Sequence, residues 1–336
     1  MLYRARVVLG LVVLALGGSC VSRDSPTGVG ERMPAGLVLQ PALIPSPADG
    51  SALPINRIRV VTARVPDNAV LGDTVVVVQS GDPSCTLDLR TMGLTADNSV
   101  LNGPGTITNA TGQTLTLRYT TVGSTAALIN NGTLVANGTV NVNGALTASA
   151  SGLIRLQGDG TTGFATLTVA QGFTNNGSIE LTSTVSAYGA TLAVPLGNTL
   201  TNAAGATITS LVGAGGSRTI DTTLDNQGTL IVAPGAAHSL QITGSLVTSG
   251  VVNLEIGGLT AATLYDRLAA TGAVTLGGTL NIGLINAFVP AIGDTFTVTT
   301  YGSRTGSFVT TNLPTLPSGS WSVGTNPTAL VLSVIP

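Results

Sequence analysis

Apolar and polar residues alternate along most of this chain, and one short phrase recurs within the alternation. It has an apolar residue, then Asn and Gly, then an apolar run: "LDNQGTLIV" begins at 224, "FTNNGSIEL" at 173, "LINNGTLVA" at 128 and "LTNAAGATI" at 200. A period of two predicts β-strands with one buried face, and Gly and Asn between the runs predict turns. The phrase therefore indicates repeated strand–turn–strand units.

The glycine of this phrase marks an internal repeat. Its positions are Gly112, Gly132, Gly152, Gly177, Gly205, Gly228, Gly250 and Gly272. These markers span 160 residues in seven steps, a mean of about 23, and the two longest steps contain the loop-like sequences "QGDGTTG" and "TSTVSAYG". A repeat of this length predicts a solenoid whose coils each hold two or three short strands. We therefore expect a parallel β-helix. Antiparallel hairpins, which Asn-Gly also favours, are the alternative.

The corner residues have expected roles in such a coil. Glycine adopts positive φ freely and Asn tolerates it, so we expect the marker glycines at positive-φ corners. Asn side chains at equivalent corners could stack into a hydrogen-bonded ladder along the axis. By strand alternation, Leu224, Leu230 and Val232 should point inward and Thr229 outward.

Composition restricts the fold and the partners. Apolar residues make up 43% of the 336 residues and charged residues 8%, against about 25% charged in an average globular domain. Val, Leu, Ile and Thr broken by Gly and Asn predict an all-β protein. The formal net charge of −2 gives no electrostatic attraction to nucleic acid or to an anionic membrane surface.

The N-terminus has the layout of an export signal. Arg4 and Arg6 precede an apolar run at 7–16, and small residues follow. This order predicts a signal peptide over residues 1–19, because the run is shorter than the roughly 20 residues of a membrane-spanning helix. The ending "LGGSC" resembles a bacterial lipobox, although the apolar residue lies four positions before the Cys instead of three. The resemblance implies that Cys20 is lipidated and becomes the mature N-terminus.

The second cysteine, Cys85, could pair with Cys20. A Cys20–Cys85 disulfide is the alternative to lipidation. After the signal, residues 20–53 are rich in Pro, Gly and Ser, which predicts a linker between the anchor and the folded part.

The folded part divides into three predicted segments. Residues 54–84 hold two β-rich runs around the turn sequence Pro66-Asp67-Asn68, which predicts a β-hairpin or an N-terminal cap. Residues 85–264 are expected to form the coils of the β-helix. Residues 265–336 are expected to form the last coils and a C-terminal cap.

The C-terminal segment contains the most specific stretch of the chain. Its characteristic residues are Tyr265-Asp266-Arg267-Leu268, Gly272, Leu276-Gly277-Gly278-Thr279-Leu280, Pro290, Gly293-Asp294-Thr295-Phe296 and Gly306-Ser307-Phe308. This stretch resembles the segment that closes the β-helical passenger region of autotransporter and filamentous-haemagglutinin-like bacterial surface adhesins. The resemblance implies a right-handed β-helix exposed at the cell surface, without catalytic residues. Autotransporters continue into a membrane barrel, whereas here we expect a lipid on Cys20 to supply the anchor.

Aromatic residues are concentrated in the same segment. They are 3% of the chain, and beyond Tyr265 five more cluster here: Phe288, Phe296, Tyr301, Phe308 and Trp321. An open last coil would expose unpaired strand edges, so we expect these rings to pack in a cap that covers it.

Residues that could carry catalysis are few. The 15 acidic residues are scattered, and the closest pair in the coil region is Asp221 and Asp225. These two should point the same way from one short strand, as solvated carboxylates. The single histidine, His238, follows a turn, has no companion for a metal site or a triad, and is expected at the surface. We therefore predict no catalytic, cofactor-binding or metal-binding residue, and no cofactor.

These features favour a non-enzymatic β-solenoid lipoprotein of the cell envelope, anchored to the outer membrane through Cys20. Its expected role is structural or adhesive, with glycans or other surface proteins as partners and no nucleic acid. The alternative is a carbohydrate-active enzyme, a pectate-lyase-like lyase or a hydrolase, which needs clustered carboxylates. An ice- or surface-binding solenoid would need a flat, regular Thr array, and the Thr residues are irregularly spaced in the sequence.

Overall fold

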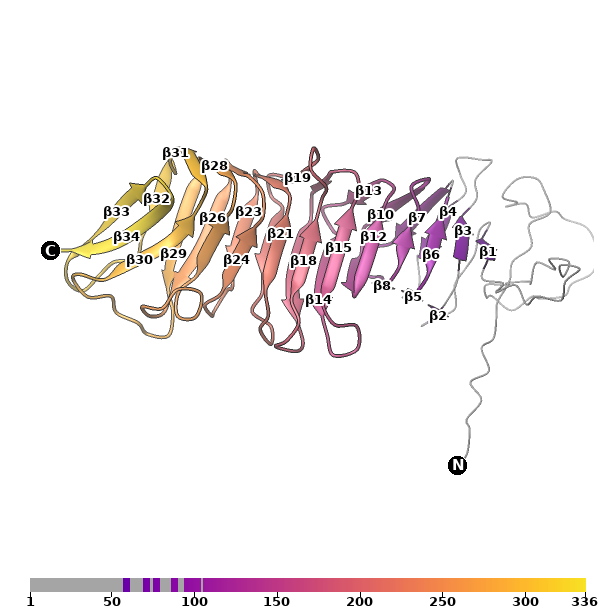
Figure 1. The fold of residues 1–336 in the computed structure, drawn as a ribbon, viewed down its shortest axis with the longest axis horizontal. Coiled ribbons are helices and arrows are strands. Elements are labelled where there is room, and N and C mark those ends of the chain that lie inside the picture. Colours follow the sequence, from indigo (N-terminus) through magenta and orange to yellow (C-terminus); the bar gives the residue numbers. More distant parts are fainter. Residues whose placement is uncertain (1–56, 61–68, 73–74, 79–85, 90–93, 104) are drawn as a thin grey trace, which may run out of the picture.

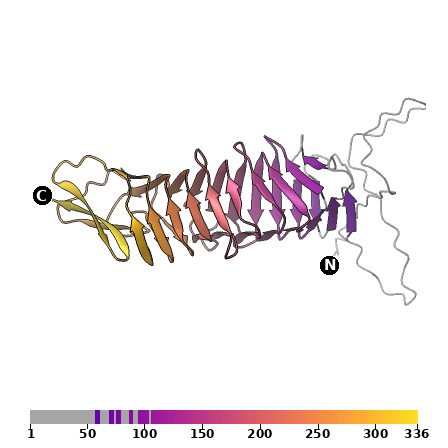
Figure 2. The ribbon, with the colours of Figure 1, turned by 90° about the horizontal axis from the view of Figure 1, so that it is seen from above.

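The structure, a computed structural model, describes residues 57–60, 69–72, 75–78, 86–89, 94–103 and 105–336. The predicted signal peptide and linker, Cys20 and Cys85 lie outside these residues. Among the described residues the regular elements are all strands, and none forms a helix long and apolar enough to cross a membrane. The strands stack into one elongated solenoid with the described N-terminal strands and the C-terminus at opposite ends (Figures 1 and 2).

Three sheets run along the solenoid. Sheet I contains, in spatial order, β1 (Arg57–Val60), β3 (Val75–Val78), β6 (Val100–Asn102), β9 (Thr121–Val122), β12 (Thr139–Val142), β15 (Ala165–Val169), β18 (Ala190–Ala193), β21 (Arg218–Asp221), β24 (Ser239–Ile242), β27 (Arg267–Ala270), β30 (Thr295–Thr300), β34 (Ala329–Ile335) and β33 (Ser320–Asn326).

Sheet II contains β2 (Ala69–Gly72), β5 (Leu94–Asp97), β8 (Thr114–Arg118), β11 (Thr133–Asn137), β14 (Leu153–Gly158), β17 (Ser178–Ser183), β20 (Thr207–Ser210), β23 (Thr229–Val232), β26 (Val251–Ile256), β29 (Thr279–Leu284) and β32 (Thr310–Asn312). Sheet III contains β31 (Ser303–Gly306), β28 (Ala273–Leu276), β25 (Leu246–Thr248), β22 (Thr223–Asn226), β19 (Thr199–Asn202), β16 (Phe173–Asn175), β13 (Leu146–Ala148), β10 (Ala126–Asn130), β7 (Gly105–Asn109) and β4 (Thr86–Leu89).

Each turn of the chain visits sheets II, I and III in that order and then returns to sheet II. Strands one turn apart pair in parallel, for example β11 with β8 and β14, and one turn takes roughly 25 residues. The parallel β-helix is therefore confirmed, and the hairpin alternative for the repeat is wrong. The expected hairpin within residues 54–84 is also wrong, because β1 pairs in parallel with β3, and β2 in parallel with β5. These strands are the first described strands of the solenoid.

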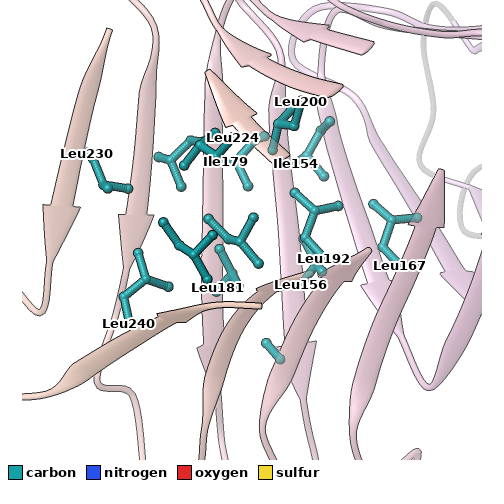
Figure 3. Packing of buried hydrophobic residues seen from close by; sticks show 14 of the residues in the cluster. Ile154, Leu156, Leu167, Ile179, Leu181, Leu192, Leu200, Leu224, Leu230 and Leu240 are labelled. Carbon is teal, nitrogen blue, oxygen red and sulfur yellow. The ribbon is translucent and has the colours of Figure 1, made fainter. Parts of the chain in front are cut away.

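The core is a set of apolar columns, one side chain per turn. In sheet II the register aligns Leu115, Leu134, Ile154, Ile179, Ile208, Leu230, Val252 and Leu280, all fully buried. Figure 3 shows several of these side chains converging with those of the other two sheets. Burying each such side chain contributes about 1.5–3 kcal/mol. The inward prediction for Leu224, Leu230 and Val232 is confirmed, and Thr229 is half-exposed as expected.

The predicted asparagine ladder is present at the corner between sheets III and II. Asn109 Nδ2 donates to Asn130 Oδ1 at 2.7 Å. After a gap at Ala148, Asn175 donates to Asn202 at 2.9 Å and Asn202 to Asn226 at 2.8 Å. Each of these amides lies inside the coil and also donates to a backbone carbonyl of the next turn; the carbonyls belong to Thr133, Leu153, Thr207, Thr229 and Val251.

The prediction that the marker glycines have positive φ is wrong at six of the eight positions. Gly112 and Gly205 have positive φ, but the other markers do not. At Gly228 a Cβ atom would instead lie 2.4 Å from the carbonyl oxygens of both Ala203 and Ala206. The other five, Gly132, Gly152, Gly177, Gly250 and Gly272, are similarly close to the backbone of the preceding turn. Glycine is needed there because two turns approach each other closely.

The C-terminal cap is confirmed. β34 pairs antiparallel with both β30 and β33, so the parallel stacking ends there. Phe296 is fully buried at the centre, with the rings of Tyr265, Phe288 and Trp321 at centroid distances of 5.5, 6.2 and 5.9 Å. Trp321 donates its Nε1 hydrogen to the Pro314 carbonyl. The rings close the apolar interior at this end.

Candidate functional site

The two aspartates noted in the sequence do not share a strand. Asp221 is the last residue of β21 in sheet I, and Asp225 lies in β22 of sheet III, beyond the buried corner residue Thr222. Asp221 accepts a hydrogen bond from the Thr243 hydroxyl, and Asp225 accepts one from Gln227 Nε2 at 2.7 Å. The expectation that both project from one strand is wrong, because the chain turns between them.

His238 is half-buried instead of lying at the surface. Its Nε2 is 2.9 Å from the Gly216 carbonyl oxygen, and its backbone N–H donates to Asp266 Oδ1 at 2.9 Å. Burial and the positive charge of Arg218 lower the pKa of His238, against the opposing effect of the Gly216 hydrogen bond. Burial therefore favours the neutral form of the ring, which contacts the loop of the preceding turn through Gly216.

Arg218 and Asp266 are buried charged residues beside this histidine. Arg218, 1% exposed, donates to the carbonyls of Leu181, Leu211, Val212 and Ser217 and to the Ser183 hydroxyl. Burial lowers its pKa to about 10. Asp266, fully buried, accepts from the backbone N–H groups of His238 and Glu255. Burial raises its pKa to about 8, even though these two hydrogen bonds lower it.

This polar cluster of Arg218, His238 and Asp266 holds loops in place. Arg218 and the His238 ring bond to residues 211–217. Asp266, directly before β27, accepts hydrogen bonds from the backbone of His238 and Glu255. Because Arg218 and Asp266 are both shielded from solvent, neither can contact a substrate directly. In the described part of the chain, no three His, Cys, Asp or Glu residues come together as metal ligands.

A shallow groove of about 500 Å³ lies at the corner between sheets I and III. Its lining residues are Ala193, Val194, Pro195, Leu196, Asp221, Thr222, Thr223, Thr243, Gly244, Ser245, Thr271 and Gly272. Leu196 is 97% exposed at its rim, and Asp221 is the one carboxylate among these residues. Hydroxyls and a single carboxylate can hydrogen-bond a polar ligand, whereas acid–base cleavage of a glycosidic bond needs two carboxyl groups.

The corner between sheets II and I carries the long loops. The first described connections there are short, at 98–99, 119–120 and 138, and the later ones are long: 159–164, 184–189, 211–217, 233–238, 257–266 and 285–294. Figure 1 shows most of these loops along one edge of the solenoid, the lower one in that view. In repeat proteins, insertions collected on one face often form the binding surface. This loop-bearing edge is the second candidate site.

Threonine columns are also present on the outside of sheet III. Register places Thr174 beside Thr201, and Thr275 beside Thr305. Asp225 and the exposed Val247 interrupt the column between these pairs. The array of aligned Thr side chains on sheet III is therefore discontinuous. Its members nevertheless lie in register, which their irregular spacing in the sequence did not indicate.

No family model matches this chain, and no curated protein matches it.

Proposed function

We propose that this protein is a non-enzymatic surface solenoid of the bacterial cell envelope, with an adhesive or structural role. Its outward residues would contact glycans or other surface proteins, and the lipid on Cys20 would anchor it to the outer membrane. The anchor rests on the N-terminal sequence alone, since residues 1–56 lie outside the described residues.

The observation that carries the proposal is the loop-bearing edge. Six consecutive loops, beginning with 159–164, project from one corner of a rigid column of stacked turns. A row of separate contact points along a rod permits multivalent binding, in which several weak contacts act together without a deep pocket. The scattered carboxylates and the buried polar cluster give no support to the enzyme alternative.

A binding screen followed by an activity assay tests the proposal. The purified chain should bind at least one glycan on an array that contains bacterial, plant and animal glycans. The bound glycan is then incubated with the protein at equimolar concentration, and product sizes are compared by mass spectrometry. Intact glycan after prolonged incubation supports binding without catalysis. Shortened or unsaturated products would overturn the non-enzymatic reading and favour the carbohydrate-active enzyme.

A further inference from the structure

Three aromatic residues are set apart from all others in the described part of the chain. Of its ten aromatic residues, Phe173 is in the core and six lie at the C-terminal end: Tyr265, Phe288, Phe296, Tyr301, Phe308 and Trp321. The remaining three, Tyr119, Phe164 and Tyr188, lie at the corner between sheets II and I. We call these three residues the aromatic platform.

The stacking of turns brings the platform together from distant parts of the sequence. Tyr119 follows β8, Phe164 directly precedes β15, and Tyr188 lies in the loop before β18. The rings of Phe164 and Tyr188 meet edge to face, with centroids 5.4 Å apart. The Tyr119 hydroxyl donates to the Thr162 carbonyl at 2.5 Å, which ties this ring to the loop that carries Phe164.

The platform faces solvent, although burial of its rings would be favourable. Phe164 is 58% exposed and Tyr119 46% exposed, and Tyr188 is half-exposed. A contiguous exposed apolar patch of a few hundred Å² is often a site of interaction. The outward positions of the adjoining strands are mostly Thr, Ser, Asn and charged residues. The other exposed large apolar residues on this edge, Val185, Leu259, Leu264, Val289 and Ile292, are aliphatic, so the platform is its aromatic part.

Hydrogen bonds fix the loop beneath the platform. Asp159 Oδ1 accepts from the backbone N–H groups of Thr161 and Thr162, both at 2.7 Å, and Asn137 donates to Oδ2. Burial by itself raises the pKa of Asp159. The backbone hydrogen bonds from Thr161 and Thr162, the Thr162 hydroxyl and the charge of Arg118 together outweigh burial, so the pKa is lowered. The loop also closes on itself through two backbone hydrogen bonds between Asp159 and Gly163. A surface that is already ordered loses little entropy when a ligand binds.

Glycine makes room for the third ring. Gly138 has φ of 63°, and a Cβ atom there would lie 2.6 Å from Tyr119 Cε1. The Tyr119 ring therefore lies flat against the backbone of the following turn. Its position is set by packing on one side and by the hydroxyl hydrogen bond on the other.

The chemistry of the surroundings selects a neutral ligand with both apolar and hydroxyl surfaces. Arg155 pairs with Glu180 at 2.7 Å, and Arg118 acts electrostatically on Asp159, so the nearby charges compensate one another. The exposed residues Thr161, Thr184 and Ser186 supply hydroxyl groups at the rim. A pyranose ring fits both requirements, because its C–H face stacks on an aromatic ring while its hydroxyls hydrogen-bond at the edge.

The size of the platform argues against a folded protein as the main partner. Three half-exposed aromatic side chains offer roughly 300 Å² of contact surface, whereas a stable protein–protein interface buries about 800 Å² on each side. One or two sugar rings match the smaller area. We infer that the aromatic platform of Tyr119, Phe164 and Tyr188 is a binding site for neutral pyranose units of a polysaccharide, an inference that rests on the proposed surface-binding function.

The test compares matched variants of the full chain by affinity electrophoresis. The gels contain a neutral polysaccharide (cellulose ether, glucomannan, xylan or soluble chitin derivative) or the acidic polymer polygalacturonate. We expect retardation of the wild type by at least one neutral polymer, and a loss of affinity of about tenfold or more in Phe164→Ala combined with Tyr188→Ala. Tyr188→Phe should retain affinity, because the ring remains. Leu196→Ala, which removes a 97% exposed apolar side chain from the groove at the other corner, should bind as the wild type does.

Each result has a defined consequence. Equal retardation of the wild type and the double alanine variant overturns the platform but leaves the proposed surface-binding function intact. Loss of binding in Leu196→Ala alone moves the site to the groove and overturns the inference. Retardation by polygalacturonate alone overturns the neutral ligand class. If no polysaccharide in the gels or on the array binds the wild type, both the inference and glycan binding by this protein are overturned. Unchanged thermal unfolding midpoints of the variants show that their folds are intact.

Discussion

Glycine residues at the solenoid corners serve two different purposes. Gly205 has φ of +86°, and no atom lies within 4 Å of the position that its Cβ would occupy. Gly228, one turn later, lacks positive φ, and its Cβ would be 2.4 Å from two carbonyl oxygens. Glycine in the same sequence phrase is therefore required for two different reasons: positive φ at one position and the lack of room for a Cβ atom at the other. Spacing alone could predict that glycine recurs, but not which constraint applies, because the close approach involves the preceding turn.

Substitution by asparagine separates these two constraints. Asn tolerates positive φ, so Gly205→Asn should lower the free energy of unfolding by less than about 1 kcal/mol. Any side chain at Gly228 must displace backbone, so Gly228→Asn should cost about 1–3 kcal/mol. Urea denaturation of both variants measures the difference. Equal losses at the two positions would contradict the close-approach explanation.

At the scale of the strand, the asparagine ladder joins the end of one sheet III strand to the next. Asn202 accepts from Asn175 and donates both to Asn226 and to the Thr229 carbonyl. Buried amides that are satisfied in this way resist any shift of register between turns, since a slip would leave them unpaired. Ala148 occupies the same column two turns earlier, so the interior also accommodates alanine at this position.

Replacement of one ladder residue by alanine should therefore lower the free energy of unfolding mainly through the lost hydrogen bonds, and less through the lost side-chain volume. Asn202→Ala leaves the Asn226 Oδ1 and the Thr229 carbonyl without this donor and should cost about 1–3 kcal/mol. The control is Asn253→Ala, at a half-exposed position on the outside of sheet II where Asn253 accepts from Asn281. Water replaces that bond, so the control should change stability by about 0.5 kcal/mol or less. Similar urea midpoints for the two variants would rule out a stabilising ladder.

Predictions of side-chain orientation within a strand were correct, because each turn repeats the same alternation. Predictions of where the chain turns from one strand to the next were wrong. Alternation was sufficient to orient Leu224, Leu230 and Val232, because every turn presents the same face inward. The hairpin predicted within residues 54–84 was wrong, because a turn sequence does not specify whether the next strand pairs with the previous one or crosses to another sheet. Asp221 and Asp225 were wrongly placed on one strand for the same reason.

At the scale of the molecule, the candidate sites arise from stacking and have little signature in the sequence. The sequences "QGDGTTG" and "TSTVSAYG" are recognisable as insertions. However, the contact of the first with Tyr119, and the contact between Phe164 and Tyr188, depend on which corner the insertions occupy. The platform residues are 45 and 24 positions apart, a separation that no local motif reveals. His238 was expected at the surface, since nothing local indicates that a loop from the preceding turn would cover it.

The stacking that creates these sites should also transmit damage along the solenoid. Leu230 is fully buried between Ile208 of the preceding turn and Val252 of the next. Leu230→Asp places a carboxylate without a partner in this apolar column, which is strongly unfavourable. Thr229 is half-exposed and faces outward, so Thr229→Asp should be nearly neutral and is the matched control. In a solenoid each turn is stabilised by contacts with its two neighbours.

Hydrogen exchange followed by mass spectrometry measures how far the damage spreads. In Leu230→Asp we expect faster exchange in β23 and also in β20 and β26, the strands that pair with it. Protection in the distant antiparallel pair of β33 and β34 should change least, because nearest-neighbour coupling weakens with each intervening turn. Thr229→Asp should retain the wild-type pattern throughout. Faster exchange confined to residues 224–232, or equal disruption by the two aspartates, would contradict stability carried from turn to turn through the apolar columns.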